Sequence, residues 1–186
     1  MYRKALILNV IFAFAATLFL VSAGEARADG GITADDVSQV GDWGQAKNVT
    51  NLKHLYFSGQ PDEATLATAS ENGVTTVINL REPSEMSWDE QAAVEAAGMK
   101  YINIPVVRGQ EFDAATMSAI TEAVQAQDGE PVLLHCGSGL RATAWLAIHM
   151  VDDHGSSQEN AFEVAEAAGL TSEGMKQRAA EYLENE

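Results

Sequence analysis

The sequence predicts an α/β protein of three layers, in which a mostly parallel sheet carries helices on both faces. Two observations predict this class. From residue 54 onward, short apolar and β-branched runs alternate with longer segments of helical pattern. The runs are apolar almost throughout, which is expected of strands covered on both faces rather than on one.

The expected elements follow one another in strand–helix order. Strands are expected at 54–58, 75–80, 101–107 and 131–135. Helices are expected at 61–71, 87–98, 114–127, 141–153 and 158–168, with a last one from residue 171. Ser87 and Glu90 have capping-box spacing, and Asp113 can cap the helix that follows it. Glu82, Glu85 and Asp89 could line a cleft, but we expect them to be loop and cap residues.

The first 28 residues are expected to form a secretory signal peptide. Basic residues at 3 and 4 precede an apolar run over 5–23, and Ala-Arg-Ala at 26–28 offers a small-x-small cleavage site. The alternative is an uncleaved anchor, because the apolar run is just long enough to span a bilayer. We expect cleavage after Ala28, and therefore a periplasmic or secreted protein that is not bound to a membrane.

The remaining chain is expected to hold an irregular N-terminal arm at 29–52, which is polar and contains glycine, and a single domain at 53–186. The full chain has 11 basic and 27 acidic residues, and loss of residues 1–28 leaves 8 and 26, a formal net charge of −18. Such a charge repels nucleic acid and anionic membranes. An anionic substrate therefore needs a local cationic site.

The chain's only cysteine, Cys136, lies where the strand at 131–135 meets the next helix, in HCGSGLRAT (135–143). Loop amides and a helix N-terminus converge there, and both favour a thiolate and a bound anion. Gly137 and Gly139 let the backbone turn tightly, and Arg141 offers a planar pair of donors to an oxyanion. The loop therefore indicates covalent catalysis on an oxyanion. The alternative is that Cys136 is a small buried hydrophobe.

HCGSGLRAT resembles the active-site loop of cysteine-dependent phosphatases, His-Cys-x-x-Gly-x-x-Arg-Ser/Thr. Together with SGQP (58–61) and VINLR (77–81), it is similar to the bacterial dual-specificity and tyrosine-phosphatase-like family. That family includes the phosphatase-like domain named after β-lactamase-hydrolase-like protein. The resemblance covers about residues 54–150. It implies a cysteine-phosphatase-like fold, no cofactor, and hydrolysis of phosphate monoesters, on a phosphorylated small molecule or a phosphoprotein, through a phosphocysteine.

The resemblance also implies the roles of single residues. Cys136 is expected to be the nucleophile, and Arg141 to hold the phosphoryl oxygens. The loop after the strand at 101–107 is expected to supply a general acid, for which Glu111 and Asp113 are the candidates. The expected substrate-binding residues are the rest of the loop: His135, Gly137, Ser138, Gly139, Leu140, Ala142 and Thr143.

Arg141 stands one residue closer to the cysteine than in the general phosphatase pattern, which would put an arginine at Ala142. At a helix start, one residue turns a side chain by about 100°. The spacing also resembles the rhodanese loop, whose cysteine carries a persulfide. A sulfurtransferase and a non-catalytic phosphate-binding domain therefore remain open as alternatives.

No metal site is expected. The three histidines outside the loop have no ligand-like neighbours in the sequence. They are His54, His149 and His154.

Overall fold

The computed structural model describes residues 31–185, so the predicted signal peptide lies outside the described residues. Six strands form one sheet in the order β1-β2-β3-β6-β4-β5. Strands β3, β6, β4 and β5 run parallel, whereas β1 and β2 are joined antiparallel at one edge. The strands are β1 Val37–Trp43, β2 Ala46–Leu52, β3 Leu55–Ser58, β4 Thr76–Asn79, β5 Lys100–Asn103 and β6 Val132–His135.

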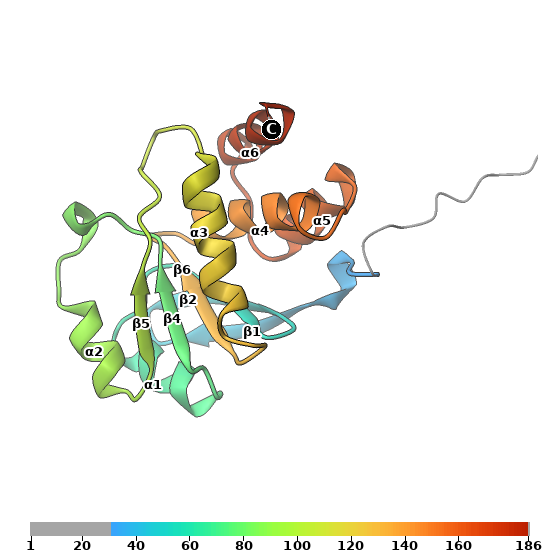
Figure 1. Ribbon diagram of the computed structural model, residues 1–186. Coiled ribbons are helices and arrows are strands. Elements are labelled where there is room, and N and C mark those ends of the chain that lie inside the picture. The colour runs from blue at the N-terminus through green and yellow to red at the C-terminus, as the bar shows by residue number, and fades with distance from the viewer. Residues whose placement is uncertain (1–30, 186) are drawn as a thin grey trace, which may run out of the picture.

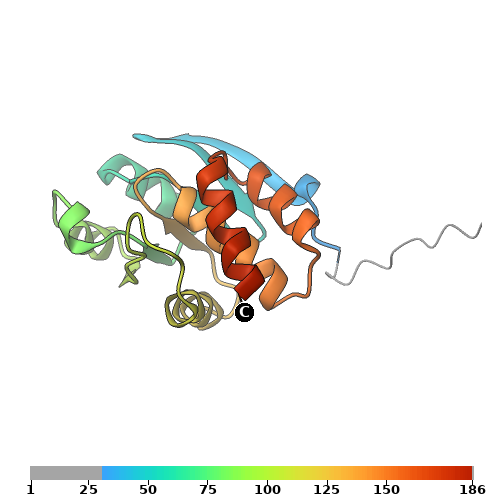
Figure 2. The same ribbon diagram turned by 90° about the horizontal axis from the view of Figure 1, so that it is seen from above.

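Helices cover both faces of this sheet, which confirms the predicted fold class. In Figure 1, α1 and α2 lie on one side of the strands, and α3 to α6 lie on the other. Figure 2 shows α6 beside α4 and α5. The helices are α1 Glu63–Glu71, α2 Glu90–Ala96, α3 Ala114–Gln125, α4 Leu140–Asp152, α5 Gln158–Ala167 and α6 Glu173–Asn185. Within residues 31–185, no helix has the length and apolar content needed to cross a membrane.

Two hydrophobic cores explain why the strands are apolar without alternation. In β6, Leu134 packs into the core under α3 to α6, and Leu133 packs into the core under α1 and α2. In β4, Ile78 and Val77 divide in the same way. Because successive side chains of a strand point to opposite faces, a strand buried on both faces needs apolar residues at every position.

The prediction of an irregular arm at 29–52 is wrong for most of that segment. Residues 37–52 form the antiparallel pair β1 and β2, and β2 continues the sheet next to β3. β1 is exposed along most of its length and its register with β2 shifts on both sides of Gly41. An edge strand held mainly by backbone hydrogen bonds has no need of apolar residues, so no apolar pattern marks β1 as a strand.

The turn of this hairpin docks on the start of α1. Gly44, with φ +56°, lies against the capping turn of α1, and a Cβ added there would come within 2.7 Å of the Thr65 backbone nitrogen. The Thr65 hydroxyl donates to the Trp43 carbonyl at 2.5 Å. The glycine therefore meets two requirements at once, a left-handed backbone and close contact with the helix.

Replacing Gly44 with alanine should lower the free energy of unfolding by more than left-handed strain alone. Gly155→Ala is the matched control, because Gly155 has φ +65° and open space around it. The strain should cost both variants about 1 kcal/mol. The clash should cost Gly44→Ala about 2 kcal/mol more. Urea unfolding measures both, and equal losses would show that the turn does not pack on α1 as described.

Candidate active site

The loop that carries Cys136 joins β6 to α4 and is held by the loop that leaves β3. Gly139 is the N-cap of α4 and has φ +87°, and a Cβ added there would lie 3.3 Å from the Ser58 carbonyl oxygen. The backbone nitrogen of Gln60 donates to the Gly137 carbonyl at 3.2 Å. The segment SGQP (58–61) thus packs against the cysteine loop and holds it in place.

Arg141 is buried and makes a bidentate ion pair with Glu85. Its two terminal nitrogens lie 2.7 and 2.8 Å from the two Glu85 carboxylate oxygens. Nη1 also donates to the carbonyls of Leu80, at 3.2 Å, and Val106, at 2.9 Å. Burial lowers the pKa of Arg141, but Glu85 and the neighbouring Cys136 sulfur outweigh burial and raise it. The arginine is therefore a fixed cation beside Cys136.

The position of Arg141 follows from how α4 packs. Ala142 stands where the general phosphatase pattern has its arginine, yet its side chain is fully buried in the hydrophobic core. A guanidinium there would be placed among apolar side chains, at a high desolvation cost. One residue earlier, the side chain reaches Glu85 and the ends of β4 and the 104–107 segment. From residue 141 the guanidinium therefore reaches polar partners rather than the hydrophobic core.

The prediction that Ser87 and Glu90 form a capping box is wrong. The cap of α2 is Asp89, whose side chain accepts from the Ala92 nitrogen at 3.0 Å. Glu90 points inward instead, and its Oε1 lies 2.7 Å from Nε2 of His135, with both side chains fully buried. These two atoms have no hydrogen-bond partner elsewhere in the described part of the chain, so each is compensated by the other. The sequence spacing suited a cap, and only the three-dimensional position of His135 shows the second role.

A continuous polar network connects this pair to Arg141. Gln60 donates from Nε2 to the second Glu90 oxygen at 2.6 Å and accepts from Arg81. Arg81 also donates to the Glu85 backbone carbonyl, and the Glu85 side chain holds Arg141. Gln60 of SGQP, Arg81 of VINLR, and His135 and Arg141 of HCGSGLRAT are therefore parts of one network.

A cavity of about 420 Å³ opens beside the loop. The loop contributes Gly137, Ser138, Leu140 and Arg141 to its wall, whereas Cys136 is only 1% exposed. The other lining residues are Glu85, Arg108, Gly109, Met175 and Arg178. The cavity brings together residues from the β4–α2 segment, the β5–α3 segment and α6.

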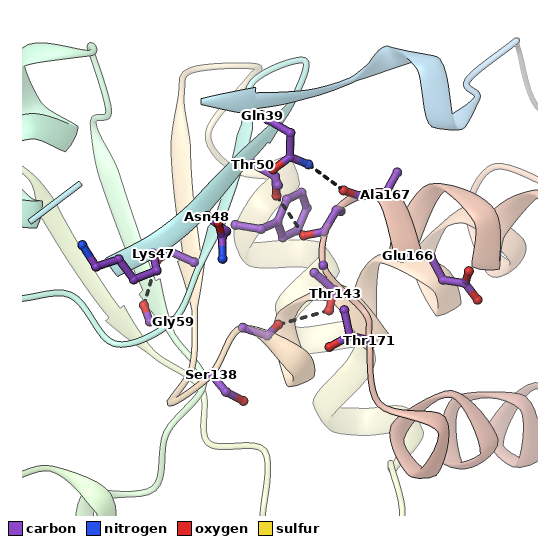
Figure 3. A pocket seen from close by; sticks show the side chains of 15 residues that line it. Gln39, Lys47, Asn48, Thr50, Gly59, Ser138, Thr143, Glu166, Ala167 and Thr171 are labelled. Atoms are coloured by element: carbon purple, nitrogen blue, oxygen red, sulfur yellow. Dashed lines mark hydrogen bonds between the residues drawn. The ribbon is translucent and has the colours of Figure 1, made fainter. Parts of the chain in front are cut away.

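A second hollow, of about 370 Å³, is also lined by Ser138 (Figure 3). The hairpin of β1 and β2 forms one wall of this hollow, and the α5–α6 turn forms another. Thr143 lines it, and its hydroxyl donates to the carbonyls of Gly139 and Leu140, at 3.2 and 3.3 Å. Thr143 therefore stabilises the first turn of α4, and its hydroxyl is engaged there rather than with the cysteine sulfur.

The loop residues expected to bind substrate occupy different environments. Gly137, Ser138 and Leu140 line the cavity, whereas His135 and Ala142 are fully buried. The structure thus brings His135 under the loop, as the partner of Glu90, and not to the cavity wall.

Neither candidate for the general acid lines this cavity. Asp113 is the N-cap of α3 and accepts from the Thr116 nitrogen at 2.9 Å. These contacts with Thr116 lower the pKa of Asp113. Glu111 is exposed and lines a smaller hollow with Tyr182. The cap predicted for Asp113 is confirmed, and the role of acid stays a prediction for both residues.

Among residues 31–185, no group of three or more His, Cys, Asp or Glu side chains is arranged to hold a metal ion. His149 is buried, stacks on Trp145 and contacts Asp153 at 2.7 Å. Burial lowers the pKa of His149, against the raising effect of Asp153.

Comparison with known proteins places this arrangement among phosphatases. Residues 47–153 match the family model described as beta-lactamase hydrolase-like protein, phosphatase-like domain. A beta-lactamase hydrolase-like protein of Xylella fastidiosa strain Temecula1 is 33% identical over 123 residues, which cover 63% of this chain and 28% of that relative. The chain therefore spans little more than a quarter of that protein's length.

Two further similarities involve a named phosphatase. The dual specificity protein phosphatase TpbA of Pseudomonas aeruginosa is 25% identical over 130 residues, 69% of this chain and 57% of the relative. The crystal structure of TpbA in complex with phosphotyrosine superposes with a TM-score of 0.60 at 22% identity, covering 73% of this chain and 82% of the other. The structure of Tk-PTP gives a TM-score of 0.60 at 21% identity, covering 71% and 92%. At these identities the structural likeness shows the fold.

The buried pair of Glu90 and His135 predicts a pH-dependent stability. Burial raises the pKa of Glu90, but His135, Gln60 and Arg81 outweigh burial and lower it below its ordinary value. The stabilisation is therefore complete above the pKa of Glu90 in the unfolded chain, and it is lost as the pH falls through the lower pKa of the folded state. At pH 7, Glu90→Gln should lose about 3 kcal/mol of unfolding free energy.

The matched control is Glu95→Gln on the same helix, where an exposed carboxylate accepts only from Gln91. It should change stability by no more than about 0.5 kcal/mol. Urea unfolding at a series of pH values should show that the difference in unfolding free energy between wild type and Glu90→Gln shrinks as the pH falls from neutral to acidic. A difference that is absent at pH 7, or that widens in acid, would contradict the pairing of Glu90 with His135.

Proposed function

Because the chain belongs to the family of the beta-lactamase hydrolase-like protein phosphatase-like domain, we propose that it hydrolyses phosphate monoesters through a phosphocysteine intermediate on Cys136. The observation that supports this most strongly is that Arg141 is fixed and charged next to Cys136, just before the N-terminus of α4. The same loop offers backbone amides to an anion. A nucleophile is thus surrounded by groups that favour a thiolate and a transferring phosphoryl group.

The proposed reaction has two steps. The Cys136 thiolate attacks phosphorus, an S–P bond forms, the ester P–O bond breaks, and the leaving oxygen takes a proton from an acid. Water then attacks phosphorus, the S–P bond breaks, and inorganic phosphate and the thiolate are released. Loop amides and the outer edge of the Arg141 guanidinium hold the non-bridging oxygens, while Glu85 fixes the guanidinium plane.

Of the two acid candidates, we favour Glu111. Asp113 caps α3, and its carboxylate already accepts from the Thr116 nitrogen at 2.9 Å. Glu111 lies in the same segment as Arg108 and Gly109, which line the cavity.

The proposed substrate is a phosphorylated small molecule or phosphoprotein. TpbA, whose structure holds phosphotyrosine, supports an aryl phosphate as the first compound to test. The second candidate is a sulfurtransferase, which the short spacing between Cys136 and Arg141 favours. In that reaction Cys136 would carry a persulfide and no general acid would be needed.

An activity assay on both substrate classes tests the proposal. Wild type, Cys136→Ser and Arg141→Lys are offered an aryl phosphate and, separately, thiosulfate with cyanide. We expect ester hydrolysis by wild type, none by Cys136→Ser, and a kcat/KM about 100-fold lower for Arg141→Lys, because an ammonium cannot reproduce two coplanar contacts. Thiocyanate formation without ester hydrolysis would favour the sulfurtransferase, and the absence of both reactions would favour a binding domain.

We further propose that the protein is exported. The support is the basic, apolar and Ala-Arg-Ala order of residues 1–28. N-terminal sequencing of protein from the native host should begin at Asp29. Recovery of chains that begin at Met1 in the membrane fraction would contradict cleavage.

A further inference from the structure

The cavity beside the cysteine loop carries more positive charge than one phosphate requires. Beyond residue 30 the chain has only four arginines, and three of them, Arg108, Arg141 and Arg178, line this cavity. The single acidic residue in the lining, Glu85, is already engaged with Arg141. In a chain with 27 acidic residues, two arginines of this cavity are therefore left without a carboxylate on its wall.

Arg178 is the more informative of the two. Its guanidinium lies over the Phe112 ring, 5.0 Å from the centroid, and its Nη1 contacts the Met175 sulfur at 4.0 Å. Its Nε and Nη2 are buried and have no hydrogen-bond partner in the part of the chain that the structure describes. A ring compensates the face of a guanidinium but not the N–H donors in its plane, and buried donors without acceptors are costly.

Lys176, two residues earlier on α6, shows that acidic partners are available to this helix. Its ammonium lies 2.6 Å from Glu166 and 2.8 Å from Glu173. The lysine that points away from the cavity is thus paired with two carboxylates, whereas the arginine that lines the cavity is paired with none. This difference along one helix is what a site for an external anion requires.

Arg108 comes from a different element, the segment between β5 and α3. Its backbone nitrogen donates to Glu82 at 3.1 Å, and its side chain is exposed, with no ion pair among residues 31–185. Arg178 and Arg108 thus place two uncommitted guanidiniums on the wall of one cavity of about 420 Å³. That volume suits a small ligand.

We propose that Arg178, assisted by Arg108, forms a second anion subsite beside the phosphate site. The preferred substrate is then a phosphate monoester that carries a second anionic group, a carboxylate or another phosphate, on its leaving group. This inference rests on the proposed function, because it takes the loop amides and Arg141 to hold the first phosphate. Arg178 acts as a specificity residue, and it lies on α6, beyond the family match that ends at residue 153.

Binding of two phosphonates that cannot be hydrolysed tests the subsite without relying on turnover. Benzylphosphonate and 4-carboxybenzylphosphonate differ by one carboxylate. Calorimetry on wild type should show the carboxylated compound binding about tenfold more tightly, as expected for a charge-assisted contact to a guanidinium. In Arg178→Gln this advantage should fall to less than about twofold, and in the control Lys176→Gln it should be kept.

The ratio of the two dissociation constants is insensitive to partial unfolding, so a less stable Arg178 variant remains informative. Arg178→Lys, which keeps the charge, should retain part of the advantage. Equal binding of the two compounds by wild type, or an advantage that survives in Arg178→Gln, overturns the subsite.

A parallel assay with phenyl phosphate separates this inference from the proposed function. Turnover without discrimination between the phosphonates refutes the subsite alone. Discrimination without turnover refutes hydrolysis alone and keeps the subsite. If neither phosphonate binds to wild type, both the phosphate site and the second subsite are refuted.

Discussion

The bidentate ion pair between Arg141 and Glu85 is the interaction on which the rest of the site depends. Arg141, a residue with 7% exposure, is tolerated because its two terminal nitrogens are met by the Glu85 carboxylate and by the carbonyls of Leu80 and Val106. The pair fixes the arginine beside Cys136 and joins α4 to the segments that follow β4 and β5. The Arg141–Glu85 pair therefore both holds the loop in position and keeps a positive charge beside Cys136.

The second constraint on the loop is the buried contact that His135 makes with Glu90. His135 precedes the cysteine, and this contact anchors the end of β6 to the start of α2. Gln60 and Arg81 complete the connection to Glu85. Each member of this network holds its neighbour in place, so a change at any one member should alter the position of the loop. The elements that meet here are far apart in sequence and come together at the carboxyl ends of parallel strands, where such folds place their sites.

Much of the fold and the centre of the site could be predicted from the sequence. The alternation of apolar strands and helices identified β3 to β6 and the three layers, and the loop motif identified Cys136 and Arg141. The β1–β2 hairpin could not be predicted, because an exposed edge strand such as β1 has no apolar pattern. Glu90 was assigned to a cap because its spacing from Ser87 fits one, and its pairing with His135 depends on how two distant segments meet. Arg178 had no motif to reveal it.

The family match ends before α5 and α6 and begins after β1, yet these elements enclose the cysteine loop on two sides. The proposed chemistry thus lies within the part shared with the family, and the proposed specificity lies outside it. The most direct test of the chemistry is to quench the protein in acid during turnover of an aryl phosphate and analyse the peptide that contains Cys136 by mass spectrometry. The account predicts a phosphoryl group on Cys136 in wild type. Turnover with an unmodified Cys136, or a persulfide in its place, would contradict it.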